Sequence, residues 1–106
     1  MEIVILKQAK RELRDAPPDI LQDVFALFED LALGKMLSMP ISRPLPSIAK
    51  GLHELRLSGE GGEYRVFYVI RIGDAIYVIH ANEKKKNELD RRTADLLKNR
   101  MRSIGL

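Results

Sequence analysis

The stretch Gly51–Lys86, GLHELRLSGEGGEYRVFYVIRIGDAIYVIHANEKKK, decides the fold of this chain. Its β-branched and aromatic residues alternate with polar ones, and glycines interrupt it, which is typical of strands joined by turns. The pattern predicts strands over Leu52–Leu57, Glu63–Ile72 and Ala75–Glu83. A glycine-rich turn joins the first two, and Gly73-Asp74 suits a two-residue hairpin turn between the last two. We therefore expect an antiparallel meander of three strands.

The flanking residues predict one more strand and three helices. Met1–Leu6 is short, apolar and rich in β-branched residues, so it predicts a first strand. Helices are expected over Lys7–Asp15, Pro18–Leu33 and Asp90–Ile104. Three prolines predict that residues 35–50 form a loop, which we interpret as a connection. The fold class is thus α+β, in the order strand, two helices, three-stranded meander and helix.

Two of these helices carry apolar faces that predict how they pack. The face of the second helix comprises Ile20, Val24, Leu27 and Leu31, with Leu21, Phe25 and Phe28 beside them. The face of the last helix comprises Leu96, Leu97, Met101 and Ile104. We expect core packing for all of them. Gly34 suits the end of the second helix, and Asp90 suits the N-cap of the last.

Composition places the chain among ordinary globular proteins. Its 106 residues suit a single domain over 1–106, with 45% hydrophobic and 31% charged residues. It has no cysteine and only two histidines, which argues against disulfides and against a thiolate or histidine-rich metal site. No apolar run reaches membrane-spanning length, and charges interrupt the N-terminus where a signal peptide would be apolar. We expect a soluble cytoplasmic protein.

The net charge of +3 is unevenly placed along the chain. Residues 84–106 contain eight Lys/Arg and three Asp/Glu, a net of +5, whereas residues 1–83 have a net of −2. A localised basic patch favours a polyanionic partner, and its alternative is a solvated basic helix.

Alternation of side chains divides the predicted sheet into two faces. In the predicted strand Glu63–Ile72, one face is the more apolar and should meet the helices. It carries Tyr64, Val66, Tyr68, Ile70 and Ile72. The second face carries Arg65, Phe67, Val69 and Arg71. A slip of one residue in the pairing would exchange the two faces, so everything below depends on register.

The two hairpins predict which residues meet on that second face. A Gly73-Asp74 turn pairs Ile72 with Ala75, and therefore Val69 with Val78, Phe67 with His80 and Arg65 with Asn82. Matching the apolar faces of the other hairpin pairs Leu55 with Val66 and Leu57 with Tyr64, and therefore Arg56 with Arg65 and Glu54 with Phe67. One row then holds Arg56, Arg65 and Asn82, the next holds Glu54, Phe67 and His80, and Lys84 continues the same face.

This face has the chemistry of a phosphate-binding surface. Opposed arginines repel unless an anion lies between them, and the guanidinium fork suits phosphate. His80 can titrate near neutral pH. Each residue also has an alternative role. Arg56 and Arg65 can pair with Glu54, Glu60 or Glu63, His80 can be a satisfied half-buried histidine, and residues 84–86 can be a solvated strand end.

The strings GLHELRL, YRVFY and AIYVIHA followed by KK, with a glycine turn between the first two, resemble the phage-derived Gp49-like or HigB-like toxins of the RelE/ParE superfamily. The resemblance covers nearly the whole chain. It implies the toxin half of a type II toxin–antitoxin pair, whose partner is a helix-turn-helix antitoxin of the HigA type. It also implies a ribosome-dependent mRNA endonuclease that needs no metal or other cofactor. In such toxins the 2′-hydroxyl attacks the adjacent phosphate and leaves a 2′,3′-cyclic phosphate and a 5′-hydroxyl.

The resemblance also implies roles for individual residues. Arg65 matches the arginine that binds the scissile phosphate, Arg56 and Lys84 match basic positions beside it, and His80 is the best acid/base candidate. The expected contacts to ribosomal or messenger phosphates are Lys85, Lys86, Arg91 and Arg92. The chain departs from the pattern at Asn82, where the family often has an aromatic residue, and at Asp90, where it often has proline.

Two alternatives remain open on the same fold. One is a ParE-like gyrase inhibitor, which needs only a protein-binding surface. The other is a catalytically decayed toxin, or RNA- or ribosome-binding module, which the asparagine at position 82 keeps in view.

Overall fold

A computed structural model of the chain describes residues 1–71, 73–85 and 89–106. The elements, in chain order, are β1 (Glu2–Ile5), α1 (Lys7–Arg14), α2 (Pro18–Ala32), β2 (Ser42–Pro44), β3 (Leu52–Gly59), β4 (Gly62–Ile70), β5 (Ala75–Glu83) and α3 (Arg91–Ser103). The predicted α+β order is confirmed. The exception is β2, a short strand within the residues expected to form only a loop.

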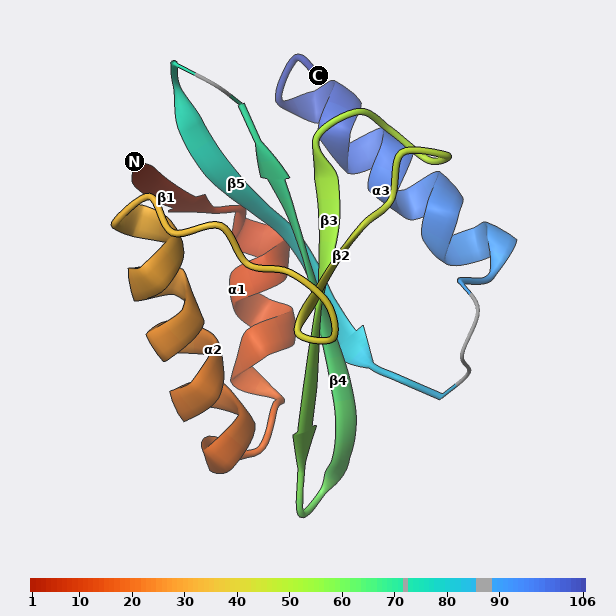
Figure 1. Cartoon of the computed structure of the whole chain (residues 1–106). Helices are drawn as coiled ribbons and strands as arrows, with labels where there is room; N and C mark the ends of the chain where they lie inside the picture. Colours follow the sequence, from red (N-terminus) through yellow and green to blue (C-terminus); the bar gives the residue numbers. More distant parts are fainter. Residues whose placement is uncertain (72, 86–88) are drawn as a thin grey trace.

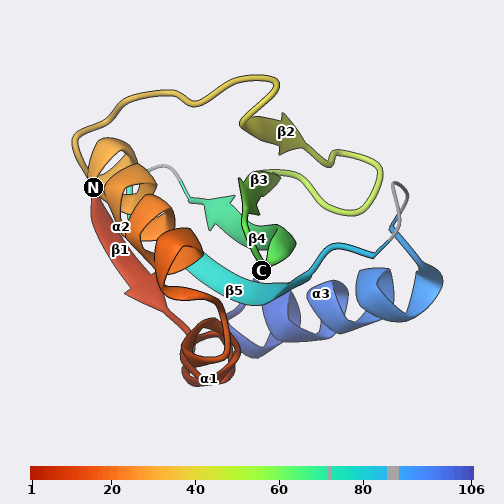
Figure 2. The same cartoon turned by 90° about the horizontal axis from the view of Figure 1, so that it is seen from below.

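The strands form one sheet in the order β1-β5-β4-β3-β2. All neighbours are antiparallel except β1 and β5, which run parallel with Glu2 opposite Ala75. Helices α1 and α2 lie on one side of this sheet and α3 lies on the other (Figure 1). Figure 2 shows β1 and β2 far apart, at opposite edges of the sheet. The meander of β3, β4 and β5 is therefore the centre of the molecule.

Apolar side chains pack on both faces of the sheet. On the α1/α2 side the core contains Leu13, Ile20, Val24, Phe28 and Leu31 from the helices, together with Leu55, Leu57, Val66, Tyr68 and Val78 from the strands. This confirms that the more apolar face meets helices. On the other side Leu97 and Met101 of α3 pack with Leu52, Phe67, Val69 and Ile79. The second face is thus partly covered by α3, a placement that alternation alone does not specify.

The register of the two hairpins is as predicted where the polar rows lie. Arg56 faces Arg65, and Glu54 faces Phe67. Phe67 faces His80, and Arg65 faces Asn82. The rows that gather charge on the second face are therefore confirmed.

Nearer the β4–β5 turn the predicted register is wrong. Val69 faces Tyr77 rather than Val78, and the predicted partner of Ala75, Ile72, lies outside the described residues. The Arg71 amide donates to the Ala75 carbonyl oxygen at 3.0 Å, so the connection is one residue longer than a two-residue turn. An irregularity between Phe67 and Tyr68 then restores the predicted pairing. The longer turn and this bulge cancel, which is why the rows farther along are correct.

Predicted helix ends agree with the structure, but the expected burial of Phe25 does not. The Asp90 carboxylate accepts a hydrogen bond from the Thr93 amide at 2.7 Å, so Asp90 is the N-cap of α3. Gly34 has φ +86°, as expected just beyond the end of α2. Phe25, expected in the core, is 50% exposed. Of the described helices, none is long and apolar enough to cross a membrane.

Candidate active site: an arginine cluster on the sheet

Three arginines surround one buried carboxylate on the second face of the sheet. Glu54 of β3 is 1% exposed. Its carboxylate oxygens lie 3.5 Å from Nη2 of Arg43, Nε of Arg56 and Nη1 of Arg65. Sheet register places them together, because Arg43 on β2 faces Glu54, and Arg65 on β4 faces Arg56. The anion expected between the opposed arginines is thus a side chain of the protein itself.

We call these four residues the arginine cluster: Arg43, Arg56, Arg65 and Glu54. Its positive charges outnumber its negative charge. Its three guanidinium groups face a single carboxylate, so its formal charge is +2. Several of its buried atoms have no hydrogen-bond partner: Nε of Arg43, Nε and Nη1 of Arg65 and both carboxylate oxygens of Glu54. Buried polar groups without partners are costly. The cluster therefore has an excess of positive charge suited to a further anion.

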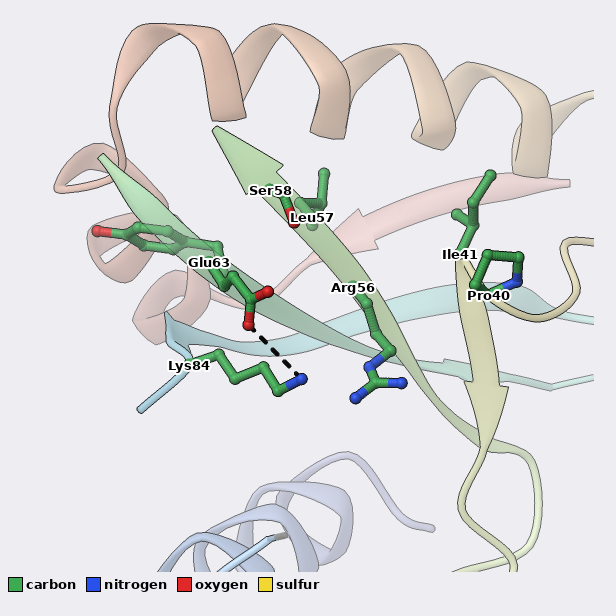
Figure 3. Close-up of a pocket in the computed structure, with 8 residues that line it drawn as sticks. Pro40, Ile41, Arg56, Leu57, Ser58, Glu63 and Lys84 are labelled. Carbon is green, nitrogen blue, oxygen red and sulfur yellow. Dashed lines mark ion pairs between the residues drawn. The ribbon is translucent and has the colours of Figure 1, made fainter. Parts of the chain in front are cut away.

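A hollow of about 360 Å³ opens beside the cluster (Figure 3). Arg56 and Lys84 line it, together with Pro40, Ile41, Leu57, Ser58, Glu63 and Tyr64. The Lys84 ammonium lies 3.7 Å from a Glu63 carboxylate oxygen, and only 10% of its side chain is exposed. Figure 3 shows the side chains of Arg56, on β3, and of Lys84, just after β5, reaching toward the same space. The hollow thus presents two cations, one of them paired with Glu63, to any molecule that binds there.

His80 is buried next to the cluster and held in place from both sides. Its ring stacks on Phe67, with centroids 5.6 Å apart, and the Arg65 guanidinium carbon lies 5.9 Å from the Phe67 centroid. Nδ1 of His80 lies 2.9 Å from a Glu12 carboxylate oxygen. Burial lowers the pKa of His80 below its ordinary value, although the hydrogen bond to Glu12 opposes this. The imidazole is therefore neutral near pH 7.

Glu12 and Arg100 join α1 to α3 around the edge of the sheet. Nη1 and Nη2 of Arg100 donate to the two Glu12 carboxylate oxygens at 2.7 and 3.0 Å. Nη1 also donates to the Ile79 carbonyl oxygen at 2.8 Å, and the Ala81 amide donates to Glu12. Burial alone would raise the pKa of Glu12, but hydrogen bonds from Arg100 and His80 lower it overall. Glu12 and Arg100 thus bind the backbone of β5 beyond the residues that pair with β1, and Glu12 fixes the orientation of His80.

The structure brings some predicted site residues together and separates others. Arg56, Arg65 and Lys84 lie around the cluster and its hollow, whereas Nδ1 of His80 faces Glu12. The alternative ion pairing of Arg56 and Arg65 with Glu54 occurs, although in the interior rather than at the surface.

The predicted RNA contacts lie at the start of α3 and just before it. Lys85 is exposed after β5, and Arg91 and Arg92 are exposed in the first turn of α3. Both arginines line a shallow hollow with Leu96, a predicted core residue that is only half-buried. Lys86 lies outside the described residues.

Sequence reasoning missed Arg43, Glu12 and Arg100. Arg43 follows a run of loop residues with no periodicity, so nothing in the sequence places it opposite Glu54. Glu12 and Arg100 are 88 positions apart. The one available signal was alternation, which puts Glu54 on the face of Arg56 and Arg65.

Asn82 lies opposite Arg65, and its side-chain oxygen has no hydrogen-bond partner. No group of three or more metal-ligating side chains occurs among the described residues. The site is thus an assembly of cations with a neighbouring histidine, suited to binding and polarising an oxyanion.

Comparisons with known proteins identify the family of the chain. Residues 11–102 match the family of phage-derived Gp49-like proteins, and the chain belongs to that family. Comparison with curated protein sequences finds no match.

Solved structures show the same fold. The toxin–antitoxin complex RelBE2 from Mycobacterium tuberculosis contains a chain with 24% identity and a TM-score of 0.57, over 78% of this chain and 96% of that one. A free-state mutant of E. coli toxin RelE has 14% identity and a TM-score of 0.52, over 97% of this chain and 96% of that one. The expected RelE-like fold is confirmed.

Proposed function

We propose that this protein is the toxin of a type II toxin–antitoxin pair and a metal-independent endonuclease of ribosome-bound mRNA. Membership of the Gp49-like family and the RelE-like fold support this class. The observation that carries the proposal is the arginine cluster, in which three arginines share one buried carboxylate and leave a formal charge of +2. An RNA phosphate is the anion that such an arrangement fits.

The reaction requires charge stabilisation at the phosphate and two proton transfers. When the 2′-hydroxyl attacks the adjacent phosphorus, negative charge grows on the non-bridging oxygens, which Arg56 and Arg65 neutralise. The P–O5′ bond breaks and leaves a 2′,3′-cyclic phosphate and a 5′-hydroxyl. Lys84 lies beside the same hollow and adds a third cation. His80, neutral at pH 7, accepts the 2′-hydroxyl proton through Nε2, the ring nitrogen that does not face Glu12. A proton from solvent water completes the departing 5′-hydroxyl.

The basic C-terminal part binds RNA around the cut. Arg91 and Arg92 are exposed at the start of α3, and Lys85 is exposed between β5 and α3. With Lys86 these residues contact messenger or ribosomal phosphates without reading sequence. The ribosome, mRNA and a helix-turn-helix antitoxin of the HigA type are the partners, and the protein acts in the cytoplasm.

Induction followed by mapping of transcript 5′ ends tests the proposal. Wild-type protein should stop growth and leave mRNA fragments with 5′-hydroxyl ends. Arg56→Gln removes one cluster charge from a side chain that is 27% exposed, so the fold should tolerate it, and cleavage should fall by at least tenfold.

Arg71→Gln is the matched control, because Arg71 lies just beyond the C-terminal end of β4 and, among the described residues, its side chain pairs with nearby Asp74 alone. It should cleave like wild type. Equal cleavage by Arg56→Gln, Arg65→Gln and wild type would remove the cluster from the reaction. DNA damage without mRNA loss would instead identify a gyrase inhibitor.

A ribosome-binding module without cleavage is the second candidate. Two observations favour it: Glu54 already occupies the centre of the cluster, and Asn82 replaces the usual aromatic residue. Co-sedimentation with ribosomes, without new 5′ ends on translated mRNA, would establish this function in place of the endonuclease.

A further inference from the structure

A second hollow, of about 300 Å³, continues from the hollow beside the arginine cluster toward α2. Four residues line both hollows: Ile41, Arg56, Leu57 and Ser58. Three residues of α2 complete the second one: Asp23, Ala26 and Leu27. We call this second space the α2 hollow. The proposed reaction uses only its Arg56 wall, so the rest of the α2 hollow has no role yet.

The two hollows meet at an edge of β3 that β2 leaves uncovered. Strand β2 pairs with β3 from His53 to Leu55, and the Arg56 amide donates to the Ile41 carbonyl oxygen at 2.8 Å. Past Arg56, β2 no longer flanks β3. Figure 3 shows Leu57 and Ile41 pointing toward α2, and Arg56 pointing to the opposite side. A molecule that occupies both hollows therefore passes around this edge, with one part beside Arg56 and another part against α2.

One flank of α2 faces this edge. Asp19 accepts a hydrogen bond from the Glu60 amide at 3.1 Å, which joins the flank to the turn after β3. Asp23 lies one helical turn further along, and Ala26 and Leu27 follow it on the same flank. Asp23 is exposed, and its carboxylate forms no ion pair or hydrogen bond within the part of the chain that the structure describes. The α2 hollow thus combines apolar walls with one unpaired carboxylate at its rim.

We propose that the α2 hollow binds the guanine base of a nucleotide whose phosphate lies at Arg56. The flat faces of an unstacked base pack against apolar side chains, which here are Leu27, Ile41 and Leu57. The volume is at the small end for ligand sites, which suits a single base. Because the base is placed next to the phosphate of the proposed reaction, the inference rests on that function and adds a choice of substrate to it.

The Asp23 carboxylate selects guanine among the bases of RNA. A carboxylate only accepts hydrogen bonds, and its two oxygens accept a pair of parallel donors. On its Watson–Crick edge, guanine presents the N1 and N2 donors side by side. Adenine and cytosine present a ring-nitrogen acceptor beside their amino donor, and uracil presents carbonyl oxygens on both sides of its N3 donor. The carboxylate therefore gains two hydrogen bonds from guanine and faces an acceptor on every other base.

Four labelled trinucleotides that cannot be cleaved provide the test. Each is U-X-U with a 2′-O-methyl group on every ribose, and X is guanine, adenine, cytosine or uracil. In fluorescence anisotropy with the full chain, the guanine trinucleotide should bind about tenfold more tightly than the other three. Amide chemical-shift changes specific to guanine should centre on Ala26, Leu27 and Ile41. The free nucleotide 5′-GMP should bind about tenfold more weakly than the guanine trinucleotide, because it lacks the neighbouring phosphates.

Variants then identify the residues responsible. Asp23→Asn replaces one of the two acceptors with a donor and should abolish the preference for guanine. Ala26→Phe fills the α2 hollow from an exposed position of the helix, which the fold should tolerate, and should equalise binding of the four trinucleotides. Arg56→Gln should weaken all four alike, because it acts on the phosphate. Glu29→Gln is the matched control, because it removes a carboxylate from an exposed position of α2 outside the hollow and should leave the preference unchanged.

Equal binding of the four trinucleotides by the wild type would overturn the inference, as would a preference for guanine that persists in Asp23→Asn and Ala26→Phe. Binding of 5′-GMP as tight as that of the guanine trinucleotide would assign the hollow to a free nucleotide, which also refutes it. Mapping of transcript 5′ ends tests the endonuclease separately. Preference for guanine in binding without any cleavage would refute the endonuclease alone, whereas cleavage with equal binding of the four would refute the guanine site alone.

Discussion

Removing Arg100 should loosen α3 from the rest of the protein. The Arg100 guanidinium is the link between α3, the Glu12 carboxylate on α1 and the Ile79 carbonyl on β5. Arg100→Gln keeps a polar side chain of similar reach to the Cδ position but removes the charge and the two-pronged contact. Glu12 then keeps its charge in a half-buried position with only His80 and the Ala81 amide to bind it.

The expected cost follows from the number of bonds and their exposure. Hydrogen bonds between charged groups contribute about 1.5–3 kcal/mol each. The Arg100 and Glu12 side chains are 16% and 25% exposed, so solvent weakens the pair relative to a fully buried one. We expect the free energy of unfolding to fall by about 2–4 kcal/mol. For a chain of this size that lowers Tm by roughly 9–18 °C.

Urea unfolding of a double-mutant cycle measures this quantity. The cycle combines Arg100→Gln with Glu12→Gln, and the coupling energy should be about 1.5–3 kcal/mol. Arg102→Gln serves as a control on the same helix, because among the described residues the Arg102 side chain bonds to exposed Asn99 alone. That variant should change stability by less than about 0.5 kcal/mol. A coupling energy below about 0.5 kcal/mol would show that the contact does not hold α3 in place.

Three further predictions concern pH, the cluster and a turn. Burial lowers the pKa of His80, so as pH falls below about 6.5 the unfolded chain binds a proton before the folded one does. The midpoint of urea unfolding should therefore decrease from pH 7 to pH 5, and it should decrease less in His80→Gln. Glu54→Gln leaves three arginines without their anion and should cost about 2–4 kcal/mol; inorganic phosphate should raise its Tm more than that of wild type, and equal shifts would contradict this. Gly51→Ala should lower the free energy of unfolding by about 2–3 kcal/mol, because Gly51 has φ +82° and an added Cβ would lie 2.9 Å from the Ile70 carbonyl oxygen. Gly73→Ala is the control: Gly73 has the same φ but lies in open space, so in thermal unfolding this variant should lose less stability.

The meander was predictable because its sequence alternates and its hairpins are short. Apolar matching between Leu55 and Val66 was enough to place Arg56 opposite Arg65. The β4–β5 hairpin was predicted with two compensating errors, since neither the longer turn nor the bulge at Ile79 leaves a signal in the residue types. Register far from a turn can therefore be right even where the turn itself is wrong.

The site residues that sequence reasoning missed lie on segments whose position relative to the sheet depends on tertiary packing. Alternation identified Glu54 as a neighbour of the arginines, but not as a residue that three of them share. Arg43 depends on how residues 35–50 return to the sheet, and Arg100 depends on the rotation of α3 about its axis. Helix periodicity gives the width of an apolar stripe but not how much of it is covered, which is why Phe25 was assigned to the core.

Because β1 pairs with β5, the sheet can be completed only after β5 has been synthesised. Glu2 can pair with Ala75, and Glu12 with Arg100, only after these later residues have been synthesised. Contacts between residues so far apart close large loops, which delays folding relative to local hairpins. In a chain still on the ribosome, the residues of β1 and α1 are therefore synthesised before β5 and α3, with which they form contacts. The arginine cluster, whose members all precede Ala75, can thus assemble earlier than the α3 contacts that orient His80 beside it.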